Sequence, residues 1–346
     1  MRTTLCKRLM GLPILLSFLF LNAANAQSPV ILFQKTIGGS SFEAFSEVQR
    51  TADGGSISVG YTVSQASGDK TENNFSNSLD TSDIWVVKLD AQGVVQWENT
   101  ISANYHDMAE SIKQTSDGGY IIGANSMSSI SGDKTENSYG GQDYWLIKLD
   151  ANGVIQWQKT MGGAGTDNLN DVQLTSDGGF IAGGYSDSGI SGNKTVASLG
   201  SHDNWVIKFD ANGNIEWQNV FGTNGIDILN EMKQTVDGGY ILGGFTYEYV
   251  GVTPNFTRYG AHDFYVVKID ALGNFQWHKA YGGTDDDYIE SLQQTTDGGY
   301  ILGGYSRSNV SGIKTENSNG GTNGDYWLVK IDAVGNIQWQ PNFESM

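Results

Sequence analysis

The stretch that decides the fold runs from Asp285 to Gln340 and reads DDDYIESLQQTTDGGYILGGYSRSNVSGIKTENSNGGTNGDYWLVKIDAVGNIQWQ. It contains four runs rich in β-branched and aromatic residues, each bounded by Gly, Asn, Asp or Ser, and such runs are typical of β-strands. They cover Ile289–Thr295, Tyr300–Ser306, Tyr326–Asp332 and Asn336–Gln340. Since nothing after residue 26 has a helical period, the sequence predicts an all-β fold.

The unit in this stretch occurs five times along the chain. The copies follow one another every ~60 residues without linkers, and such repeats stack because each unit needs its neighbours to bury an apolar face. Four short strands per repeat are typical of a β-propeller blade. The sequence therefore predicts a single domain over residues 27–346, a β-propeller of about five four-stranded blades. The repeats cover residues 37–100, 101–160, 161–220, 221–280 and 281–340.

Two turns and one variable loop connect the strands of each repeat. Thr-x-Asp-Gly-Gly, with Gly298 or Gly299 at positive φ, predicts a tight hairpin between strands one and two. Asp332–Gly335 predicts a type I turn, closed by a left-handed glycine, between strands three and four. All variation in repeat length falls between strands two and three, for example from Ser128 to Gln142. We therefore expect the variable loops to share one face, where repeat proteins usually bind partners.

A tryptophan recurs in the fourth strand of each repeat, and glycine interrupts the second strand, as at Gly303 and Gly304. A backbone without Cβ lets a large ring lie flat against it, so we expect each tryptophan to pack on second-strand glycines of an adjoining blade. Exposed tryptophans that stack on sugars are the alternative. The tryptophans are Trp97, Trp157, Trp217, Trp277 and Trp339.

Residues 1–26 have the composition of an export signal peptide. Arg2, Lys7 and Arg8 precede a short apolar run, and small residues precede a predicted cleavage site before Gln27. The run is too short to span a bilayer and no later segment qualifies, so we expect no membrane span. The single cysteine, Cys6, lies in this segment, which leaves the remainder without a disulfide. The predicted location is extracellular or at the cell surface, with the periplasm as the alternative.

The formal net charge of −18 narrows the classes of partner. A strongly negative surface repels nucleic acid and anionic lipid, so we expect no nucleic-acid partner. It attracts cations, above all Ca²⁺, which prefers oxygen ligands. The alternative is that the acidic surface only keeps an exported protein soluble.

The stretch VVKIDALGNFQWHKAYGG, Val266–Gly283, resembles the tryptophan-docking segment of quinoprotein-like β-propellers. The whole repeat, including GGTDDDYIESLQQTTDGGYILGGYS, resembles the propeller repeats of exported bacterial surface proteins associated with type IX secretion. This resemblance covers residues 30–340. It implies a propeller fold and an exported location, and it implies little about chemistry.

An additional strand is predicted at the N-terminal end of the repeats. Residues 30–36 read VILFQKT and align with IQWQKT of the second repeat, with Phe33 in the tryptophan's place. We expect this strand to close the ring by pairing in the last blade. The alternative is a remnant of a sixth blade, which would leave unpaired sheet edges.

Two sets of acidic residues recur. Members of the first set stand ten residues before each Asp-Gly-Gly and could form a carboxylate ring that holds Ca²⁺ at one mouth of a central channel. Alternatively, each carboxylate accepts N–H bonds from its own turn. Members of the second set, such as Asp83, precede strand three, and we expect third-strand lysines such as Lys88 to bond to them between blades. The first set is Glu43, Asp107, Asp167, Asp227 and Asp287.

The fourth repeat carries an aromatic and arginine-containing loop where the other repeats have Ser-Gly-x-Lys-Thr. Such a composition is typical of ligand-contact surfaces, and the alternative is a loop that folds over its own blade. His202 and His262 occupy one place in consecutive repeats, where a Zn²⁺ site competes with ordinary surface polarity. The candidate loop residues are Tyr247, Tyr249, Phe256, Arg258 and Tyr259.

No Gly-x-Ser-x-Gly, His-Glu-x-x-His or phosphate-binding glycine loop occurs in the sequence. We therefore predict an exported, non-enzymatic binding or scaffold protein that presents variable loops to a glycan or an extracellular protein, without a cofactor other than Ca²⁺. One alternative is an enzyme, quinoprotein-like or glycan-cleaving, with a site over the central axis. The other is a calcium-dependent structural module.

Overall fold

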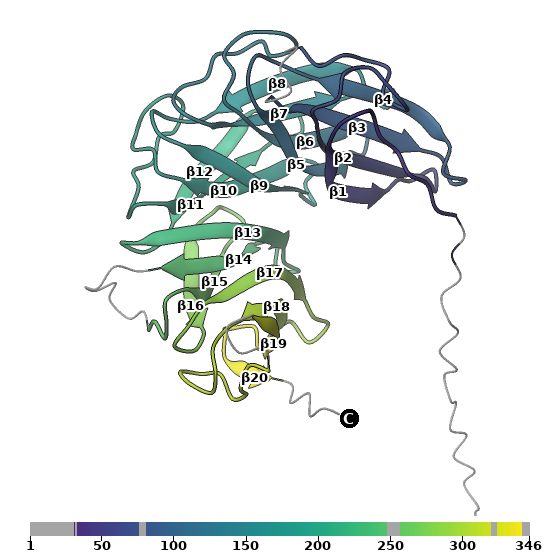
Figure 1. Cartoon of the computed structure of the whole chain (residues 1–346). Helices are drawn as coiled ribbons and strands as arrows, with labels where there is room; N and C mark the ends of the chain where they lie inside the picture. The colour runs from purple at the N-terminus through teal and green to yellow at the C-terminus, as the bar shows by residue number, and fades with distance from the viewer. Residues whose placement is uncertain (1–30, 32, 76–80, 248–256, 320–323, 341–346) are drawn as a thin grey trace, which may run out of the picture. The chain divides into compact units, whose positions relative to one another are not determined.

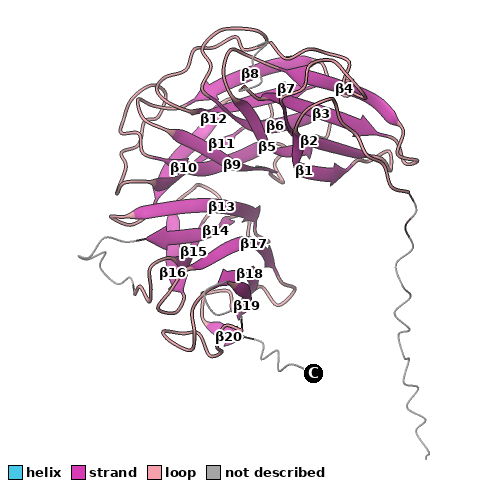
Figure 2. Ribbon diagram, viewed as in Figure 1, coloured by secondary structure: helices cyan, strands magenta, loops and turns pink. Residues whose placement is uncertain are grey.

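The computed structural model describes residues 31, 33–75, 81–247, 257–319 and 324–340, and these residues form twenty β-strands and no helix. None of them therefore belongs to a helix that could cross a membrane. The strands make five four-stranded antiparallel sheets, which follow one another from purple to yellow in Figure 1 and are drawn as magenta arrows in Figure 2. Strands consecutive in sequence are neighbours in every sheet. The predicted all-β fold with five four-stranded blades is confirmed.

Each sheet takes its strands from one repeat. The first sheet holds β1 (Glu43–Arg50), β2 (Ser56–Thr62), β3 (Asp83–Leu89) and β4 (Val95–Ile101). The second holds β5 (Asp107–Gln114), β6 (Tyr120–Ser126), β7 (Asp143–Leu149) and β8 (Ile155–Met161). The third holds β9 (Asp167–Leu174), β10 (Phe180–Ser186), β11 (Asp203–Phe209) and β12 (Ile215–Phe221). The fourth holds β13 (Ile226–Gln234), β14 (Tyr240–Tyr247), β15 (Asp263–Ile269) and β16 (Phe275–Tyr281). The fifth holds β17 (Asp287–Gln294), β18 (Tyr300–Ser306), β19 (Asp325–Ile331) and β20 (Ile337–Trp339).

Both predicted turns are present, and a left-handed backbone explains their glycines. In the β17–β18 turn, Gly298 has φ +83° and donates its N–H to Thr295 O at 2.9 Å. The next N–H, of Gly299, donates to the Asp297 carboxylate at 3.0 Å. Gly335 also has φ +83°, in the β19–β20 turn. Glycine is favoured at φ > 0 because it has no Cβ to clash with the backbone.

The two second-strand glycines make different contacts, and the structure shows why each must lack a side chain. A Cβ added at Gly184 would lie 1.9 Å from Asn168 O, where the β9–β10 ladder contains a bulge. A Cβ added at Gly183 would lie 2.7 Å from Leu229 Cδ2, a side chain of the next sheet. The prediction that these glycines receive the fourth-strand tryptophans is wrong, since an aliphatic side chain fills that place.

The fourth-strand tryptophans pack instead on the turn glycine of the following sheet. A Cβ at Gly153 would lie 2.8 Å from the ring of Trp97, and the same contact joins each later tryptophan to its neighbour's turn, up to Trp277 on Gly335. Neighbouring sheets are offset, so the turn between the third and fourth strands of one sheet lies over the fourth strand of the sheet before it. Indole packing between sheets is therefore their role, and Trp339, after which the described residues contain no further sheet, is 44% exposed.

The third-strand lysines form ion pairs within their own sheets. Lys88 Nζ lies 2.8 Å from Asp53 Oδ2, and the other four lysines meet the Asp of their own Asp-Gly-Gly turns at 2.9–3.0 Å. The prediction that they bond to acids such as Asp83 between blades is wrong. Antiparallel pairing of β3 with β2 puts the end of β3 beside the β1–β2 turn, whereas Asp83 begins the strand.

Consecutive sheets pack through the first strand of the later one. β5 contacts β1, β2 and β3, and β9, β13 and β17 contact their preceding sheets in the same way. The apolar cores lie between sheets; for example, Ile57 and Val59 share a buried cluster with Ile112 and Trp145. Among the described strands, no contact of comparable extent joins the fifth sheet to the first.

The predicted closing strand is absent from the described part of residues 30–36. Residues 33–36 form no strand, Phe33 is 49% exposed, and β20 pairs only with β19. A closing strand would have to pair with β19, the third strand of the last sheet, and β20 already occupies that edge. Val30 and Leu32 lie outside the described residues.

Candidate functional site

Five aromatic side chains gather where the fourth and fifth sheets meet, and we call them the aromatic cluster: Phe245, Tyr247, His262, Tyr288 and Tyr305. The His262 ring lies 5.5 Å from that of Phe245 and 5.1 Å from that of Tyr247, centroid to centroid. The His262 ring also stacks on Tyr288 at 4.9 Å. Tyr288 in turn stacks on Tyr305 at 5.0 Å. The rings therefore form one continuous group with members from both sheets.

A carboxylate and a guanidinium border the aromatic cluster. His262 Nδ1 lies 2.7 Å from Asp286 Oδ1, and Arg307 donates from Nη1 to Asp286 Oδ2 at 3.0 Å. The Arg307 side chain is 44% exposed, so its remaining N–H groups reach solvent. Burial, and next the charge of Asp286, raise the pKa of Tyr288 to about 12, which keeps its phenol a neutral hydrogen-bond donor. The site thus combines apolar rings with hydrogen-bond donors and an acid.

The aromatic cluster lies at the end of the sheets where the variable loops begin. Tyr247 is the last residue of β14, His262 directly precedes β15, and Asp286 directly precedes β17. The other sheets do not repeat it: the place of Tyr288 is taken by Met108 in β5, and by Asn168 and Ile228 in the next two first strands. The Phe245–His262 pair has a counterpart in the third sheet, Tyr185–His202 at 5.7 Å, so Tyr247 and Tyr288 are the members that set this cluster apart.

The predicted loop residues have different surroundings. Tyr247 belongs to the aromatic cluster. Tyr259 packs against the corresponding loop of the fifth sheet, where a Cβ at Gly312 would lie 2.8 Å from its Cδ1. Arg258 is exposed beside Asp263, whose pKa its charge lowers against the larger raising effect of burial. Tyr249 and Phe256 lie outside the described residues.

The first set of recurring acids lies at the boundaries between sheets. Its four aspartates are 0% exposed. They accept bonds from nearby N–H groups, for example from Gly163 to Asp167 at 2.7 Å and from Gly283 to Asp287 at 2.8 Å. Glu43, in the first sheet, is half-buried and accepts a bond from Thr62 Oγ1 at 3.3 Å. Local turn contacts of the kind expected in the alternative interpretation are therefore present.

Each buried aspartate of the first set is paired with an aspartate of the second set from the preceding sheet. Among the described residues, Oδ1 of every carboxylate in these pairs is buried without a hydrogen-bond partner. Burial, and next the charge of Asp107, raise the pKa of Asp83 to about 7. Burial likewise raises the pKa of Asp227 to about 7. The pairs are Asp83–Asp107, Asp143–Asp167, Asp203–Asp227 and Asp263–Asp287.

Such a carboxylate pair can hold a shared proton or a cation. Ca²⁺ usually takes six to eight oxygen ligands, so two carboxylates would need backbone carbonyls to complete a site. In the part of the chain that the structure describes, no group of three or more His, Cys, Asp or Glu side chains could hold a metal. His202 and His262 likewise have separate surroundings, with His202 next to Tyr185.

The lysine of the common Ser-Gly-x-Lys-Thr loop has a structural role that the sequence did not reveal. Lys134 is 1% exposed, lies 4.9 Å from the ring centroid of Trp145, and donates to Thr160 Oγ1 at 2.5 Å. Burial lowers its pKa to about 8, against the attraction of Asp107 and its neighbours. The fourth repeat has no such lysine, because its aromatic loop replaces the motif.

No protein-family model matches the chain. The chain is 24% identical over 331 residues to "Regulatory protein FlaEY" of Caulobacter vibrioides; the match covers 87% of this chain and 34% of that protein, so the chain spans about a third of its length. Among solved structures, Sqt1 from Chaetomium thermophilum is 12% identical, with a TM-score of 0.42 and 86% of this chain and 71% of that one covered. BamB from Moraxella catarrhalis is 13% identical, with a TM-score of 0.34 and coverage of 87% and 80%. These likenesses are too weak to add to what the five sheets show.

Proposed function

We propose that the protein is an exported, non-enzymatic β-propeller that binds a glycan or an extracellular protein on its loop face. The aromatic cluster carries this proposal, because Tyr247 and Tyr288 have no aromatic counterparts at the same places of the other repeats. Tyrosine and arginine dominate binding hot spots since they combine a large apolar area with hydrogen-bonding groups. The exported location is supported by the composition of residues 1–26 and by the resemblance to repeats of type IX-associated surface proteins.

The chemistry of the cluster fits a neutral or weakly polar partner. The rings supply apolar contact area, and Arg307 and Asp286 supply a donor and an acceptor within one small surface. The overall net charge of −18 disfavours a polyanionic partner. The name of the Caulobacter relative, a regulatory protein, is compatible with a binding role for the third of it that this chain matches.

A glycan-array screen with matched variants tests the proposal. Tyr247→Ala combined with Arg307→Ala removes an edge ring and the exposed guanidinium, and we expect binding to fall at least tenfold. Tyr105→Ala is the control, because Tyr105 is 59% exposed in the β4–β5 connection and lies outside the cluster. The same variants compared in a pull-down from the extracellular fraction test a protein partner. Equal binding by the double variant and the control in both assays would contradict the proposal.

A calcium-dependent structural module is the second candidate, favoured by the buried, unpartnered Oδ1 atoms of the aspartate pairs. In that role Ca²⁺ would be held between sheets and would stabilise the stack without taking part in partner binding. Its test is thermal unfolding with and without Ca²⁺.

A further inference from the structure

The joint between neighbouring sheets has a projecting half and a receiving half. Between the second and third sheets, the first strand β9 projects Leu169 and Val172 toward Gly123 of β6. A Cβ at Gly123 would lie 2.5 Å from Leu169 Cδ2 and 3.4 Å from Val172 Cβ. Tyr144 of the receiving sheet donates its hydroxyl to Trp205 O of the projecting sheet at 3.1 Å. Leu169, Val172, Gly123 and Tyr144 are all buried in this joint.

The projecting half is also present on the first sheet, but nothing in the described residues covers it. Phe45 and Val48 of β1 occupy the places of Leu169 and Val172. Phe45 is 46% exposed and Val48 is 66% exposed, whereas Leu169 and Val172 are 0% exposed. Two large apolar side chains therefore stand at one end of the series of sheets with the geometry of an internal joint.

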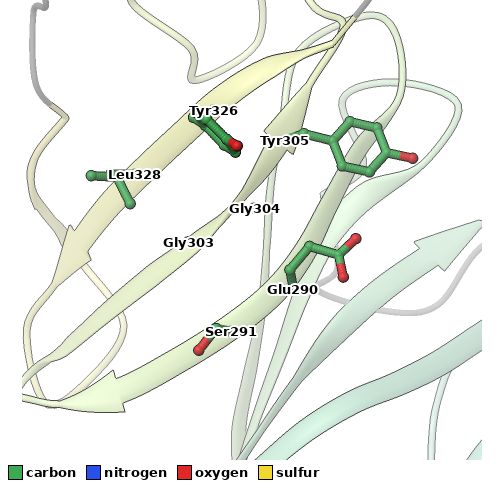
Figure 3. Close-up of a pocket in the computed structure, with 7 residues that line it drawn as sticks. All are labelled: Glu290, Ser291, Gly303, Gly304, Tyr305, Tyr326 and Leu328. Atoms are coloured by element: carbon green, nitrogen blue, oxygen red, sulfur yellow. The ribbon is translucent and has the colours of Figure 1, made fainter. Parts of the chain in front are cut away.

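The receiving half is present on the fifth sheet in the same open condition. Figure 3 shows the hollow it forms, lined by strands β17, β18 and β19, and its volume is about 580 Å³. A Cβ at Gly303 would approach only Leu328 and Ser291 of its own sheet. Tyr326 is 95% exposed, whereas Tyr144 in the same place is buried.

The receiving faces of the second and fifth sheets have the same residue at five of the seven positions that line the hollow, and they differ where Gly304 and Tyr305 stand in place of Ala124 and Asn125. Glu290, Ser291, Gly303, Tyr326 and Leu328 line the open hollow. The corresponding residues of the covered face are Glu110, Ser111, Gly123, Tyr144 and Leu146. The projecting valine is also the same residue, Val48 in place of Val172. As far as the structure describes them, the outer faces of the first and fifth sheets are apolar at these positions.

We propose that the free faces of two copies of this chain dock head to tail, with β1 of one copy on the β17–β19 face of the next. The interface follows the joint between the second and third sheets, with Phe45 in place of Leu169. Tyr305 stands in place of Asn125, so the two hydrogen bonds that Asn125 makes with Leu169 across the internal joint have no counterpart. It is heterologous, because the projecting and receiving surfaces differ, and each added copy again offers one face of each kind. Association therefore continues until a ring of copies closes or a filament forms.

Sedimentation velocity with charge-bearing variants tests this docking. Val48→Asp disables the projecting face and Tyr326→Asp disables the receiving face, and both positions are exposed enough to accept the change without unfolding. We expect the wild-type chain to form species larger than a dimer as concentration rises, and each variant alone to stay monomeric. A one-to-one mixture of the two variants should form a dimer and nothing larger, because each retains one intact face.

The control variant is Val236→Asp, at a valine that is 90% exposed in the β13–β14 turn, and it should associate like the wild type. Circular dichroism checks that all variants are folded. A wild-type chain that stays monomeric at its highest soluble concentration would overturn the proposal. The chain would also stay monomeric if its own two free faces met each other. An associating wild type whose two variants do not pair in the mixture would overturn the head-to-tail geometry.

Discussion

Val172 and Val48 occupy equivalent positions in two first strands, yet replacing each with alanine should lower stability by very different amounts. Val172 in β9 is 0% exposed and packs over Gly123, whereas Val48 in β1 is 66% exposed. Val172→Ala removes two buried methyl groups, which costs about 1.6 kcal/mol of transfer free energy at about 0.8 kcal/mol per group. The residual cavity adds on the order of 1 kcal/mol. We expect Val172→Ala to lower the free energy of unfolding by about 2–3 kcal/mol.

Val48→Ala should lower the free energy of unfolding by no more than about 0.5 kcal/mol, as is usual for exposed positions. Both substitutions change the β-propensity of a first strand equally, so the difference between them isolates the packing between sheets. Urea denaturation followed by tryptophan fluorescence, at a concentration too low for association, measures both values. Losses that agree within about 0.5 kcal/mol would refute the reasoning, because the first sheet would then be as well covered as the third.

Three further predictions concern the glycines and the buried acids. Gly184→Ala should cost several kcal/mol of stability, because its Cβ would lie 1.9 Å from Asn168 O. The control, Gly189→Ala, should leave the Tm unchanged, because no atom lies within 4 Å of its Cβ. Equal Tm values for the two variants would contradict the close approach. In chelator, stability should fall as pH rises from 5 to 8, by at least about 1 kcal/mol, because the pKa values of Asp83 and Asp227 are raised to about 7. A group whose pKa is raised in the folded state stabilises the protein fully below about pH 4, and this stabilisation is lost as the pH rises through 7. A free energy of unfolding that does not change between about pH 5 and 8 would show that the pairs carry no proton. At pH 8, where the pairs are ionised, millimolar Ca²⁺ should raise the Tm if it occupies them, and a Tm that neither Ca²⁺ nor chelator changes would exclude the calcium-dependent module.

The strands and turns could be predicted because each is specified by residues close together in sequence. β-Branched and aromatic content marked the strands, and the turn glycines at Gly298 and Gly335 adopt the left-handed backbone that their motifs require. Contacts between repeats were less accessible. The sequence shows that tryptophan and glycine both recur, but which glycine meets Trp97 depends on the stagger of the sheets, and the partner is Gly153 of the turn.

The aromatic cluster was only partly predictable. Tyr247 and the aromatic loop depart visibly from the repeat, and they lie at the boundary between the fourth and fifth sheets where the cluster forms. Tyr288 and Tyr305 lie within ordinary-looking strands of the next repeat, and only the packing of the two sheets brings them to His262. A column-by-column comparison of the repeats would have shown that Tyr288 replaces Met108 and its equivalents. The repeat pattern alone does not show which acid each third-strand lysine meets, because that depends on the direction of β3 beside β2.

Within the described residues, the joints between consecutive sheets are filled, whereas the matching faces of the first and fifth sheets are left open. Hydrogen exchange of the first strands tests this difference most directly. At low protein concentration, the amides of β1 (Glu43–Arg50) should exchange much faster than those of β9 (Asp167–Leu174), although each strand has eight residues and pairs with one neighbour in its own sheet. The protection of β1 should then increase as the concentration is raised. Protection of β1 equal to that of β9 at every concentration would contradict the account.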